Sequence, residues 1–400
     1  MSAPSFLEKL LDGAEVEWVP LGHDNFFEIA NSARRPVKAS LRAAGKIPYY
    51  GANNIQDYVD GHTHSGEYVL IAEDGSANLE NYSIQYVSGN FWANNHVHVV
   101  RGTDAVDTRF LFHCLTTTNF LPFLSSKERA KLTKGNLVQI TVPIPFPDDP
   151  EKSLAIQGEI VRILDTFTEL TAELTAELNQ RKKQYNHYRD QLLSHPSGNM
   201  AWKPLGWVGE VRMCKRVMKN QTSEAGDIPF FKIGTFGREP NAFISRELFE
   251  KFRKQYSYPK IGDVLISASG TIGRTVIFNG EEAYFQDSNI VWLENDESKV
   301  LNKYLFYFYQ IAKWHVSDGG VIKRLYNDNI KKTLIAVPYP DNPEKSLEEQ
   351  ARIVAILDKF DTLTTSPTEG LPREIELRDK QYAYYRDQLL SFPKPDEMAA

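Results

Sequence analysis

Residues 145–194 read PFPDDPEKSLAIQGEIVRILDTFTELTAELTAELNQRKKQYNHYRDQLLS, and residues 338–391 read PYPDNPEKSLEEQARIVAILDKFDTLTTSPTEGLPREIELRDKQYAYYRDQLLS. The two stretches match without a gap over their first 21 residues, at a constant offset of 193 residues. A repeat of this length indicates that the chain is a duplication. The rest of the chain should therefore divide into two equivalent halves.

Each copy of the repeat is expected to form a long helix. In the first copy the apolar residues follow the alternating steps of four and three of a coiled-coil seam. Roughly 40 helical residues span about 60 Å, and a helix of that length with one apolar stripe needs a partner. The natural partner is the second copy. The seam of the first copy comprises Ile156, Ile160, Ile163, Phe167, Leu170, Leu174, Leu178, Tyr185, Tyr188 and Leu192.

Two local features modify these helices. Thr-Ala-Glu-Leu occurs twice in tandem, at residues 171–174 and 175–178, and four extra residues in a heptad pattern form a stutter that locally changes the supercoil. The second copy opens with Ser346-Leu-Glu-Glu349, which has the form of a capping box. We expect a kink or break near Ser366-Pro367 and Pro372, because proline interrupts a helix.

Composition limits the class of protein. The 400 residues, 42% of them hydrophobic, suit two or three domains. No segment resembles a membrane span or a signal peptide, and two distant cysteines, Cys114 and Cys214, fit a reducing cytoplasm. The net charge of −6 is concentrated in residues 341–400, which carry 8 Lys/Arg and 13 Asp/Glu. Local basic patches in the nearly neutral remainder are therefore compatible with phosphate binding.

The order of segments suggests a circular arrangement. Leu7-Glu-Lys-Leu-Leu11, followed by Trp18, resembles Arg189-Asp-Gln-Leu-Leu193, followed by Trp202. The N-terminus thus resembles the end of a helical repeat, and two such units could close with pseudo-two-fold symmetry. The predicted parts are an N-terminal helical segment (1–14), a first globular domain (15–144), a central helical spacer (145–198), a second globular domain (199–337) and a C-terminal helical spacer (338–400).

The two globular domains share several matching sequence segments, but the loops that connect these segments differ. Gly45-Lys-Ile-Pro-Tyr-Tyr50 corresponds to Gly226-Asp-Ile-Pro-Phe-Phe231, and Lys131-Leu132 corresponds to Arg324-Leu325. Short β-rich runs between Gly, Asn and Asp turns predict α+β domains around a twisted sheet. A shared framework with diverged loops is typical of two copies of one recognition domain that recognise different targets.

These features resemble the specificity (S) subunit of a type I restriction-modification enzyme. The resemblance rests on the paired domains and the EKSL…Q…ILD motif at residues 151–165 and 344–358, and the tandem Thr-Ala-Glu-Leu resembles the type IC subgroup. It covers essentially the whole chain. It implies two target-recognition domains separated by long antiparallel coiled-coil helices, each domain reading one half of a split site in double-stranded DNA. The proline interruption in the second helix departs from this pattern.

The resemblance also implies partners and cofactors. The helices would bind two methyltransferase (M) subunits, and motor-nuclease (R) subunits would join through them. The chain would be cytoplasmic, without a membrane contact, a metal or a catalytic centre of its own. It would bind no cofactor itself, while S-adenosylmethionine would serve the M subunits, and ATP and Mg the R subunits. The residues expected to form the spacer and bind partners are Ile160, Phe167, Leu170, Leu174, Leu178, Tyr185, Tyr188, Ile353, Leu357, Phe360, Tyr382 and Tyr385.

Candidate DNA contacts are amide, hydroxyl and basic side chains in Gly-containing loops, because base edges are read by donors and acceptors while cations hold phosphates. Asn and Gly also form ordinary turns, so each loop has a structural alternative. In the first domain the candidates are Tyr50, Asn53, Asn54, Asp74, Ser76, Asn94, Asn95, His96, Lys127, Arg129, Lys131 and Lys134. In the second they are Ser267, Ser269, Thr271, Arg274, Gln286, Ser288, Asn289, Lys323 and Arg324.

Several sequence motifs resemble metal, catalytic or phosphate-binding sites but have simpler structural explanations. His62-Thr-His64 and His96-Val-His98 place imidazoles in pairs, but nothing marks the further ligands that a metal needs. The Asp148-Asp149…Lys152 cluster recurs in the second copy and is expected to be a helix-leading turn. Ser269-Gly-Thr-Ile-Gly-Arg274 lacks the Gly-Lys-Ser/Thr ending of a phosphate-binding loop.

Two other functional classes remain open at this stage. The chain could be a scaffold that presents two protein-binding domains on a coiled coil, or an enzyme fused to its reader. Salt-sensitive binding to duplex DNA would favour the reader over the scaffold, because only DNA binding releases counterions. The absence of recognisable catalytic motifs in the sequence speaks against the enzyme.

Overall fold

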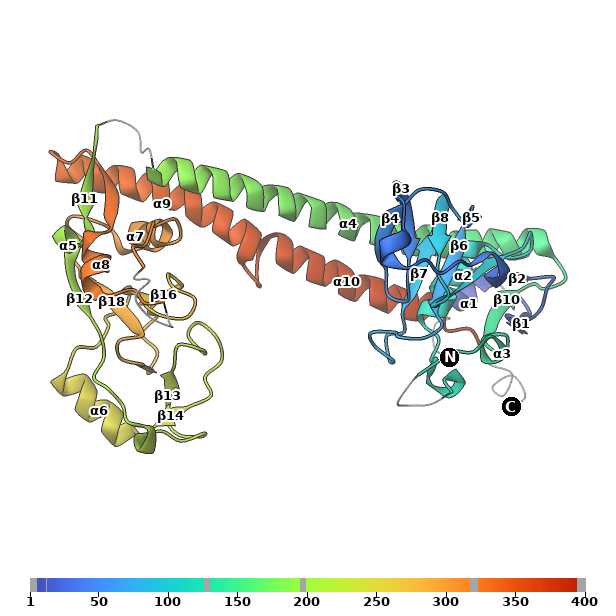
Figure 1. Ribbon diagram of the computed structural model, residues 1–400, viewed down its shortest axis with the longest axis horizontal. Helices are drawn as coiled ribbons and strands as arrows, with labels where there is room; N and C mark the ends of the chain where they lie inside the picture. Colours follow the sequence, from blue (N-terminus) through green and yellow to red (C-terminus); the bar gives the residue numbers. More distant parts are fainter. Residues whose placement is uncertain (1–5, 12, 126–129, 195–198, 317–322, 394–400) are drawn as a thin grey trace. The chain divides into compact units, whose positions relative to one another are not determined.

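The computed structural model describes residues 6–11, 13–125, 130–194, 199–316 and 323–393. It divides the chain into two compact units, each containing one globular domain (Figure 1). Unit 1 comprises Met1–Leu174 and Glu374–Ala400, and unit 2 comprises Thr175–Arg373. Each unit therefore combines a domain with parts of both copies of the helical repeat. The boundary within the first copy falls between the two Thr-Ala-Glu-Leu blocks.

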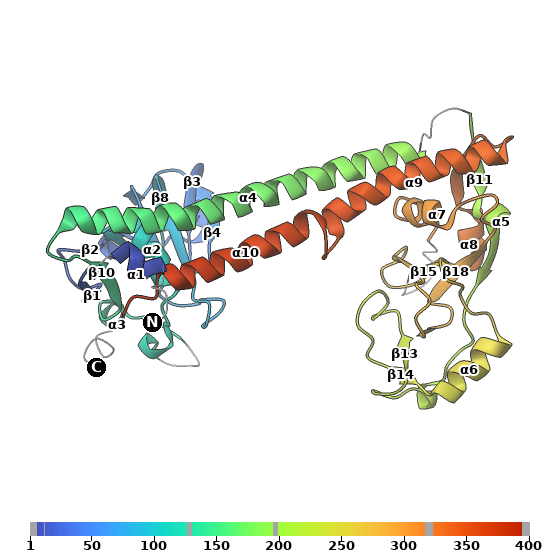
Figure 2. The same cartoon turned by 180° about the vertical axis from the view of Figure 1, so that it is seen from behind.

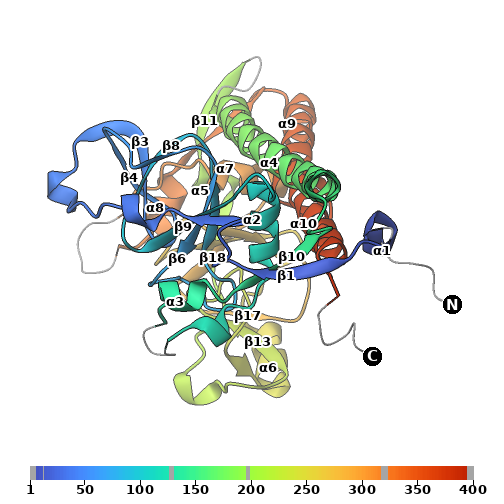
Figure 3. The same cartoon turned by 90° about the vertical axis from the view of Figure 1, so that its right-hand side faces the viewer.

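Domain 1 contains two four-stranded sheets and a separate strand pair. One sheet has the order β2 (Phe27–Ile29), β9 (Val97–Gly102), β6 (Tyr68–Ala72), β7 (Ile84–Val87). The other has the order β4 (Ile55–Val59), β3 (Ala44–Tyr50), β8 (Asn90–Ala93), β5 (His64–Ser65). Strand β1 (Val16–Pro20) pairs antiparallel with β10 (Thr141–Pro145), and the two lie side by side in Figure 3. The helices are α1 (Phe6–Leu11), α2 (Thr108–Thr116) and α3 (Lys134–Leu137), with single 3-10 turns η1 (Asn31–Ala33), η2 (Ala39–Leu41) and η3 (Leu121–Phe123).

Domain 2 repeats this plan. Its main sheet has the order β12 (Gly209–Arg212), β18 (Ile290–Asn295), β15 (Val264–Ser267), β16 (Thr275–Ile277). Its second sheet has the order β14 (Phe243–Ile244), β13 (Ile228–Phe231), β17 (Tyr284–Phe285), and β11 (Met200–Pro204) pairs with β19 (Leu334–Pro338). The helices are α5 (Leu205–Val208), α6 (Arg246–Gln255), α7 (Asn302–Tyr309) and α8 (Asn327–Lys332), with the 3-10 turn η4 (Lys219–Gln221).

The strand orders confirm the α+β prediction and the duplication. Strands β2, β9, β6 and β7 correspond in order to β12, β18, β15 and β16. In both second sheets the strand carrying the Gly-x-Ile-Pro motif makes a parallel pair, β3 with β8 and β13 with β17. A shared parallel pairing in otherwise antiparallel domains is a specific topological match.

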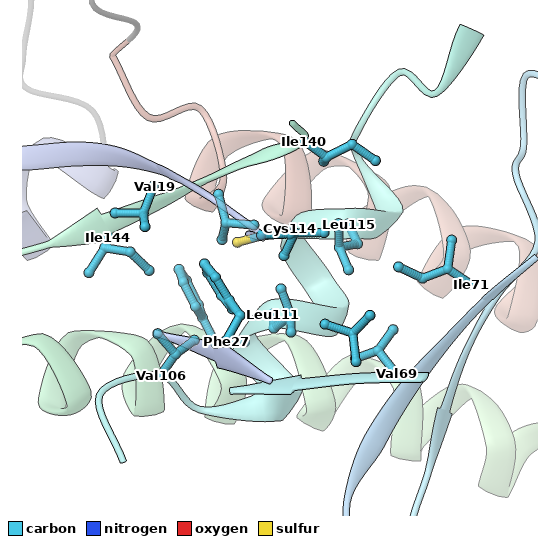
Figure 4. Close-up of a cluster of buried hydrophobic side chains, with 14 of the residues drawn as sticks. Val19, Phe27, Val69, Ile71, Val106, Leu111, Cys114, Leu115, Ile140 and Ile144 are labelled. Carbon is cyan, nitrogen blue, oxygen red and sulfur yellow. The ribbon is translucent and has the colours of Figure 1, made fainter. Parts of the chain in front are cut away.

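The core of domain 1 lies on both faces of strand β6. Val69 and Ile71 face α2, where Leu111, Cys114 and Leu115 pack around them (Figure 4). Tyr68 and Leu70 point the other way, because successive strand residues alternate in direction, and they join Phe91 of the second sheet in a separate buried cluster. A strand covered on both faces is apolar throughout, which explains the continuous run Tyr68–Ala72.

The long-helix prediction is confirmed, but both helices begin later than expected. Helix α4 spans Pro150–Ser194, and the first helix of the second copy, α9, begins at Pro343. The first residues of each copy instead complete strands β10 and β19, and Phe146 and Tyr339 then turn with φ of 46° and 45°. These two non-glycine residues occupy equivalent places in the repeat.

The capping-box prediction at Ser346 is wrong. The N-cap is Asn342, whose Oδ1 accepts the N–H of Lys345 at 3.0 Å, and Asp149 accepts the N–H of Lys152 at 3.2 Å in the first copy. A short polar side chain directly before a proline at the first helical turn already satisfies the free N–H groups. The Asp-containing stretch is thus the helix-leading turn that the sequence predicts.

The predicted interruption of the second helix is confirmed. Helix α9 ends at Thr365, and α10 spans Gly370–Leu389. The break coincides with Pro367, and Gly370 adopts a φ of 75° that other residues rarely reach. Pro372 lies in the first turn of α10, where its missing N–H costs little.

The two copies of the repeat contact each other inside each unit. In unit 1 Phe167 of α4 stacks on Tyr385 of α10, with ring centroids 5.1 Å apart. In unit 2 Tyr185 and Tyr188 of α4 both contact Phe360 of α9, at 6.3 and 5.7 Å. These aromatic residues belong to the stripes that the sequence assigns to helix packing.

The first and last described segments of the chain meet in unit 1, as the circular arrangement predicts. Helix α1 lies beside the C-terminal end of α10 (Figures 2 and 3). Its residues Leu7 and Leu11 share a buried cluster with Leu389 and Phe392. The indole N–H of Trp18 donates to the carbonyl of Pro393 at 2.8 Å. No helix among the described residues has the length and apolar character needed to traverse a lipid bilayer.

Residues that are identical in the two copies of the repeat hold each globular domain against its helix. Gln157 is fully buried; its amide donates to the carbonyl of Ala105 at 3.2 Å and accepts the N–H of Asp107 at 2.8 Å. Gln350 makes the equivalent pair with Lys299 and Leu301, at 3.1 and 3.0 Å. Both glutamines also donate to a buried serine one turn earlier, Ser153 or Ser346.

The aspartate that ends the motif provides a second anchor. Asp165 accepts from Arg109 and His113 of α2, both at 2.9 Å. Asp358 accepts from Lys303 and Tyr307 of α7, at 2.7 and 2.6 Å. Burial, together with the hydrogen bond to Asp358, raises the pKa of Tyr307, so its hydroxyl remains a donor. The glutamine and aspartate of the motif therefore fix the helix relative to the globular domain.

Candidate nucleic-acid interface

Three candidate residues of domain 1 converge beyond the end of strand β6. His96 Nδ1 lies 2.6 Å from a carboxylate oxygen of Asp74, and Asp74 forms an isolated β-bridge with Lys131. The segment is held by backbone hydrogen bonds from Glu73 N–H to His96 and from Leu132 N–H to Glu73. The side chains of Asp74, His96 and Lys131 are each 39–48% exposed. They present a mixed set of donors, acceptors and charge to solvent.

Glu73 lies beneath this group and holds two cations. Its carboxylate is 2.7 Å from Arg34 Nη1 and 3.0 Å from Lys131 Nζ. Burial opposes ionisation of Glu73, but the hydrogen bonds from Arg34 and Lys131 prevail and lower its pKa. The same contact raises the pKa of Lys131. The position of the Lys131 ammonium is therefore set from within the domain.

Domain 2 builds the same arrangement from different side chains. The backbone hydrogen bonds recur, from Ala268 N–H to Asn289 and from Leu325 N–H to Ala268. Ser269 forms the isolated bridge with Arg324, as Asp74 does with Lys131. Asn289 Oδ1 accepts from Ser269 Oγ at 2.7 Å and from Arg324 Nη2 at 3.0 Å. Asp74, His96 and Lys131 thus correspond in position to Ser269, Asn289 and Arg324.

A cavity of about 410 Å³ adjoins this arrangement in domain 2. Its wall combines four cations with the side-chain amides of Gln286 and Asn289, and Arg216 pairs with Asp287 at 2.8 Å. Arginine beside amides is a composition suited to base edges and phosphates. The lining residues are Arg216, Val217, Lys219, Thr222, Phe230, Lys232, Gln286, Asp287, Asn289 and Arg324.

The other candidates of domain 1 have varied surroundings. Tyr50 is half-buried with its ring against Phe91, and burial raises its pKa. Asn53 is exposed but joins two loops, donating to Gly75 and accepting from Ala77. Asn94 is 3% exposed and caps its own loop through the N–H of His96.

The remaining domain 1 candidates divide into three cases. Asn54, Asn95 and Lys134 are exposed. Ser76 binds within its own loop, donating to the carbonyl of Asn78 at 2.7 Å. Lys127 and Arg129 lie outside the described residues.

In domain 2 several candidates serve the loop between β15 and β16. Ser267 is 1% exposed, donates to the carbonyl of Thr271 and accepts the N–H of Arg274. Arg274 donates to the carbonyl of Phe236, and Thr271 is exposed.

The other domain 2 candidates lie near the cavity wall or on the surface. Gln286 accepts the N–H of Ile233 at 3.0 Å. Ser288 has a left-handed φ of 59°, which shapes the bend before β18. Lys323 is exposed.

The sequence interpretation missed a basic element that contributes to both sites. Residues 34–50, RRPVKASLRAAGKIPYY, align without a gap with residues 215–231, KRVMKNQTSEAGDIPFF, at an offset of 181. Arg34 of the first stretch holds Glu73, and Arg216 and Lys219 of the second line the cavity. The Gly-x-Ile-Pro match that the sequence interpretation recognised is the end of this longer repeat. Extending that match upstream would have found it.

The spacer residues fall into three groups. Ile160, Ile353 and Leu357 are fully buried in the cores of their own domains, so their side chains are occupied there. Leu164, which the seam pattern omits, is equally buried. Phe167, Tyr185, Tyr188, Phe360 and Tyr385 contact the neighbouring helix of their unit, as described above. Leu170, Leu174, Leu178 and Tyr382 are half-buried.

Comparison with known proteins defines the family. The protein-family model of the type I restriction modification DNA specificity domain matches residues 15–183 and again residues 199–377. The chain therefore belongs to the type I restriction-modification DNA specificity family, with two copies of the family domain.

Individual relatives span the full chain. A Haemophilus influenzae protein assigned as a type I restriction enzyme specificity subunit is 62% identical over 97% of this chain and 98% of its own length. The EcoR124I/EcoR124II specificity subunit of Escherichia coli is 36% identical over the whole of both chains. The type IC-like expectation is consistent with this second relative.

A solved structure supports the fold. The crystal structure of the S subunit of a type I restriction-modification system from M. genitalium gives a TM-score of 0.57 at 14% identity, covering 96% of this chain and 97% of that one. A second structure, from a study of complex assembly and conformational transition of the type I R-M system, gives a TM-score of 0.56 at 16% identity.

Proposed function

We propose that this chain, a non-catalytic DNA specificity subunit, reads a split target through two separate sites, one on each domain. The single observation that carries the proposal is the positional match of Asp74, His96 and Lys131 with Ser269, Asn289 and Arg324. The scaffold at these positions is the same, whereas the hydrogen-bonding groups differ. One framework carrying two sets of readout groups is suited to two different half-sites.

The chemistry of the two sites supports recognition of base edges. Arginine and asparagine present pairs of groups that match guanine and adenine in the major groove, and carboxylates accept from cytosine. Domain 2 offers Arg324 and Asn289, while domain 1 offers Asp74 with His96 and Lys131. We therefore expect the two half-sites to differ in sequence.

The helices are proposed to set the gap between the half-sites and to bind two methyltransferase (M) subunits. Tyr188 and Tyr384 remain 44% and 62% exposed on α4 and α10, and exposed tyrosines are common anchors of protein interfaces. Motor-nuclease (R) subunits would join through the M subunits. S-adenosylmethionine would then serve the M subunits, and ATP and Mg the R subunits. Because the target is DNA, we also propose a cytoplasmic location.

The alternative function is a scaffold whose two domains bind proteins. It makes the opposite prediction about salt, since a site that neutralises phosphates loses affinity steeply as salt rises. The cations of the domain 2 cavity favour DNA over an uncharged protein surface.

The test is a map of modified adenines. The chain would be expressed with its methyltransferase partner in a host that lacks adenine methylation, and methylated sites would be mapped across the genome. We expect a motif of two short fixed blocks separated by a gap of constant length. A continuous motif would refute the two-domain reading, and a stable complex without new methylation would favour the scaffold.

A further inference from the structure

The basic elements at residues 34–38 and 215–219 are a repeated feature of the two domains. We call them the basic segments. Arg35 and Lys38 of the first are identical to Arg216 and Lys219 of the second, and a further cation precedes each pair. Lys38 directly precedes the 3-10 turn η2, and Lys219 is the first residue of the 3-10 turn η4. Each turn is followed by the strand that forms the parallel pair. The structural context of the two segments is therefore similar.

The basic segments contain cations that have no acidic partner. Lys38 and Lys219 are exposed, and neither has a salt bridge or a side-chain hydrogen bond with another described residue. Arg34 and Arg216, in contrast, are held by Glu73 and Asp287. Of its three cations, each segment thus has one that is fixed by an acidic residue of the domain, at a different position in the two segments, and an exposed lysine at the same position.

Each segment adjoins the group of residues that differs between the domains. Arg34 reaches Glu73, which also holds Lys131. Arg216 and Lys219 share the cavity wall with Asn289 and Arg324. A ligand that covers the divergent residues would therefore also lie near the basic segment.

The contrast between the two sets of residues indicates what each one contacts. Two half-sites of different sequence share one chemical feature, the phosphodiester backbone. Residues that contact phosphates can stay the same in both domains, whereas residues that read bases must differ. The second and fifth residues of the basic segments are identical in the two domains, whereas Asp74 and His96 are replaced by Ser269 and Asn289.

We propose that Lys38 and Lys219 are equivalent phosphate-binding residues that position each domain on the DNA backbone without reading sequence. The inference rests on the proposed DNA-reading function and adds a division of labour within each site. An acidic protein surface is the competing ligand for these cations, and the test below distinguishes it.

The test compares variants of the full complex with the methyltransferase partner. Its probes are a duplex that carries the mapped motif and a duplex with both half-sites scrambled. Affinity for each would be measured across a salt series for the double variant Lys38→Ala/Lys219→Ala. The matched control is Lys9→Ala/Lys332→Ala, which removes one exposed lysine from the last turn of a short helix in each unit.

We expect the double variant to bind both duplexes more weakly, with a plot of log affinity against log salt that is less steep by about 2. The mapped methylation motif should stay unchanged, and Lys38→Arg/Lys219→Arg should restore the wild-type slope. The control should leave the slope unchanged.

Three results would overturn the proposal. One is a slope equal to that of the control, as expected if these lysines meet a protein surface. Another is a change in the motif itself, which would make them base readers. The third is a failure of the arginine pair to restore the slope. If the wild-type complex does not prefer the specific duplex, the proposed function itself fails, and this is established before any variant is compared.

Discussion

The side-chain amide of Gln157 brackets the backbone on either side of Val106, donating to Ala105 and accepting from Asp107. Gln350 brackets Val300 in the same way, through Lys299 and Leu301. Each glutamine is fully buried. The glutamine of the repeated motif therefore holds the loop that leads into α2 in domain 1 and into α7 in domain 2.

The first prediction concerns this bracket. Gln157→Ala and Gln350→Ala should each lower the free energy of unfolding of their own unit by about 1–3 kcal/mol, because buried backbone groups lose their partners. For units of this size the melting temperature should fall by about 2–4 °C per kcal/mol. The control is Gln180→Ala, at an exposed position on α4. It should change the free energy of unfolding by less than about 0.5 kcal/mol. An equal effect of all three substitutions would contradict the bracket.

The second prediction concerns the length of α4. Deleting Thr175–Leu178 removes one of two tandem blocks and about 6 Å of helix. Because base pairs are stacked at about 3.4 Å, the gap in the methylation motif should shorten by one or two base pairs. Both half-sites should stay the same, since no residue of either globular domain is altered. Altered bases within a half-site would show that the helix does not act as a ruler.

The third prediction separates the two readers. Asn289→Ala and Arg324→Ala should relax the sequence preference within one half-site only, with a loss of discrimination of about 1–3 kcal/mol for each paired contact. The other half-site should be unaffected. Genome-wide methylation would show this directly as degeneracy confined to one block. Degeneracy in both blocks would mean that the two domains do not read independently.

The fourth prediction concerns acid. Burial lowers the pKa of His64, His98 and His113, all in domain 1, although hydrogen bonds to oxygen atoms partly oppose it. The unfolded state therefore binds more protons below about pH 6.5, so the stability of domain 1 should decrease as pH falls from 7.5 to 5.5. Hydrogen exchange, corrected for the intrinsic rate, should show faster exchange in β6, β9 and α2 at pH 5.5. His113→Gln should reduce this pH dependence, and stronger protection at pH 5.5 would refute the prediction.

The sequence was sufficient to predict the duplication, the long helices and the break at Pro367, because these follow from local rules of spacing and proline geometry. It also predicted that the first and last described segments meet, through the likeness of residues 7–22 to the end of α4 and the strand that follows it. The buried face of the helices was only partly predicted. A single seam cannot represent a helix that packs against a domain through Gln157 and Leu164 and against another helix through Phe167.

The candidate site was harder to predict because its geometry comes from residues far apart in the chain. Asp74, His96 and Lys131 were singled out separately, but only the fold shows that they adjoin one another. The burial of Asn94 and Ser267 was also inaccessible, since amide and hydroxyl side chains that support a loop look the same in sequence as those that face a ligand. Arg34 was missed because it lies upstream of the recognised Gly-x-Ile-Pro match.

The division of α4 between two units has a consequence at the level of the gene. The boundary falls within the Thr-Ala-Glu-Leu tandem, and the glutamine and aspartate that hold domain 1 lie on its N-terminal side. A crossover between two related genes at this tandem would exchange domain 1 together with the α4 residues that dock it, while the C-terminal part of unit 1 would come from the other gene. New combinations of half-sites could thus arise in a single recombination event, and a change in tandem number during the exchange would alter the spacing as well.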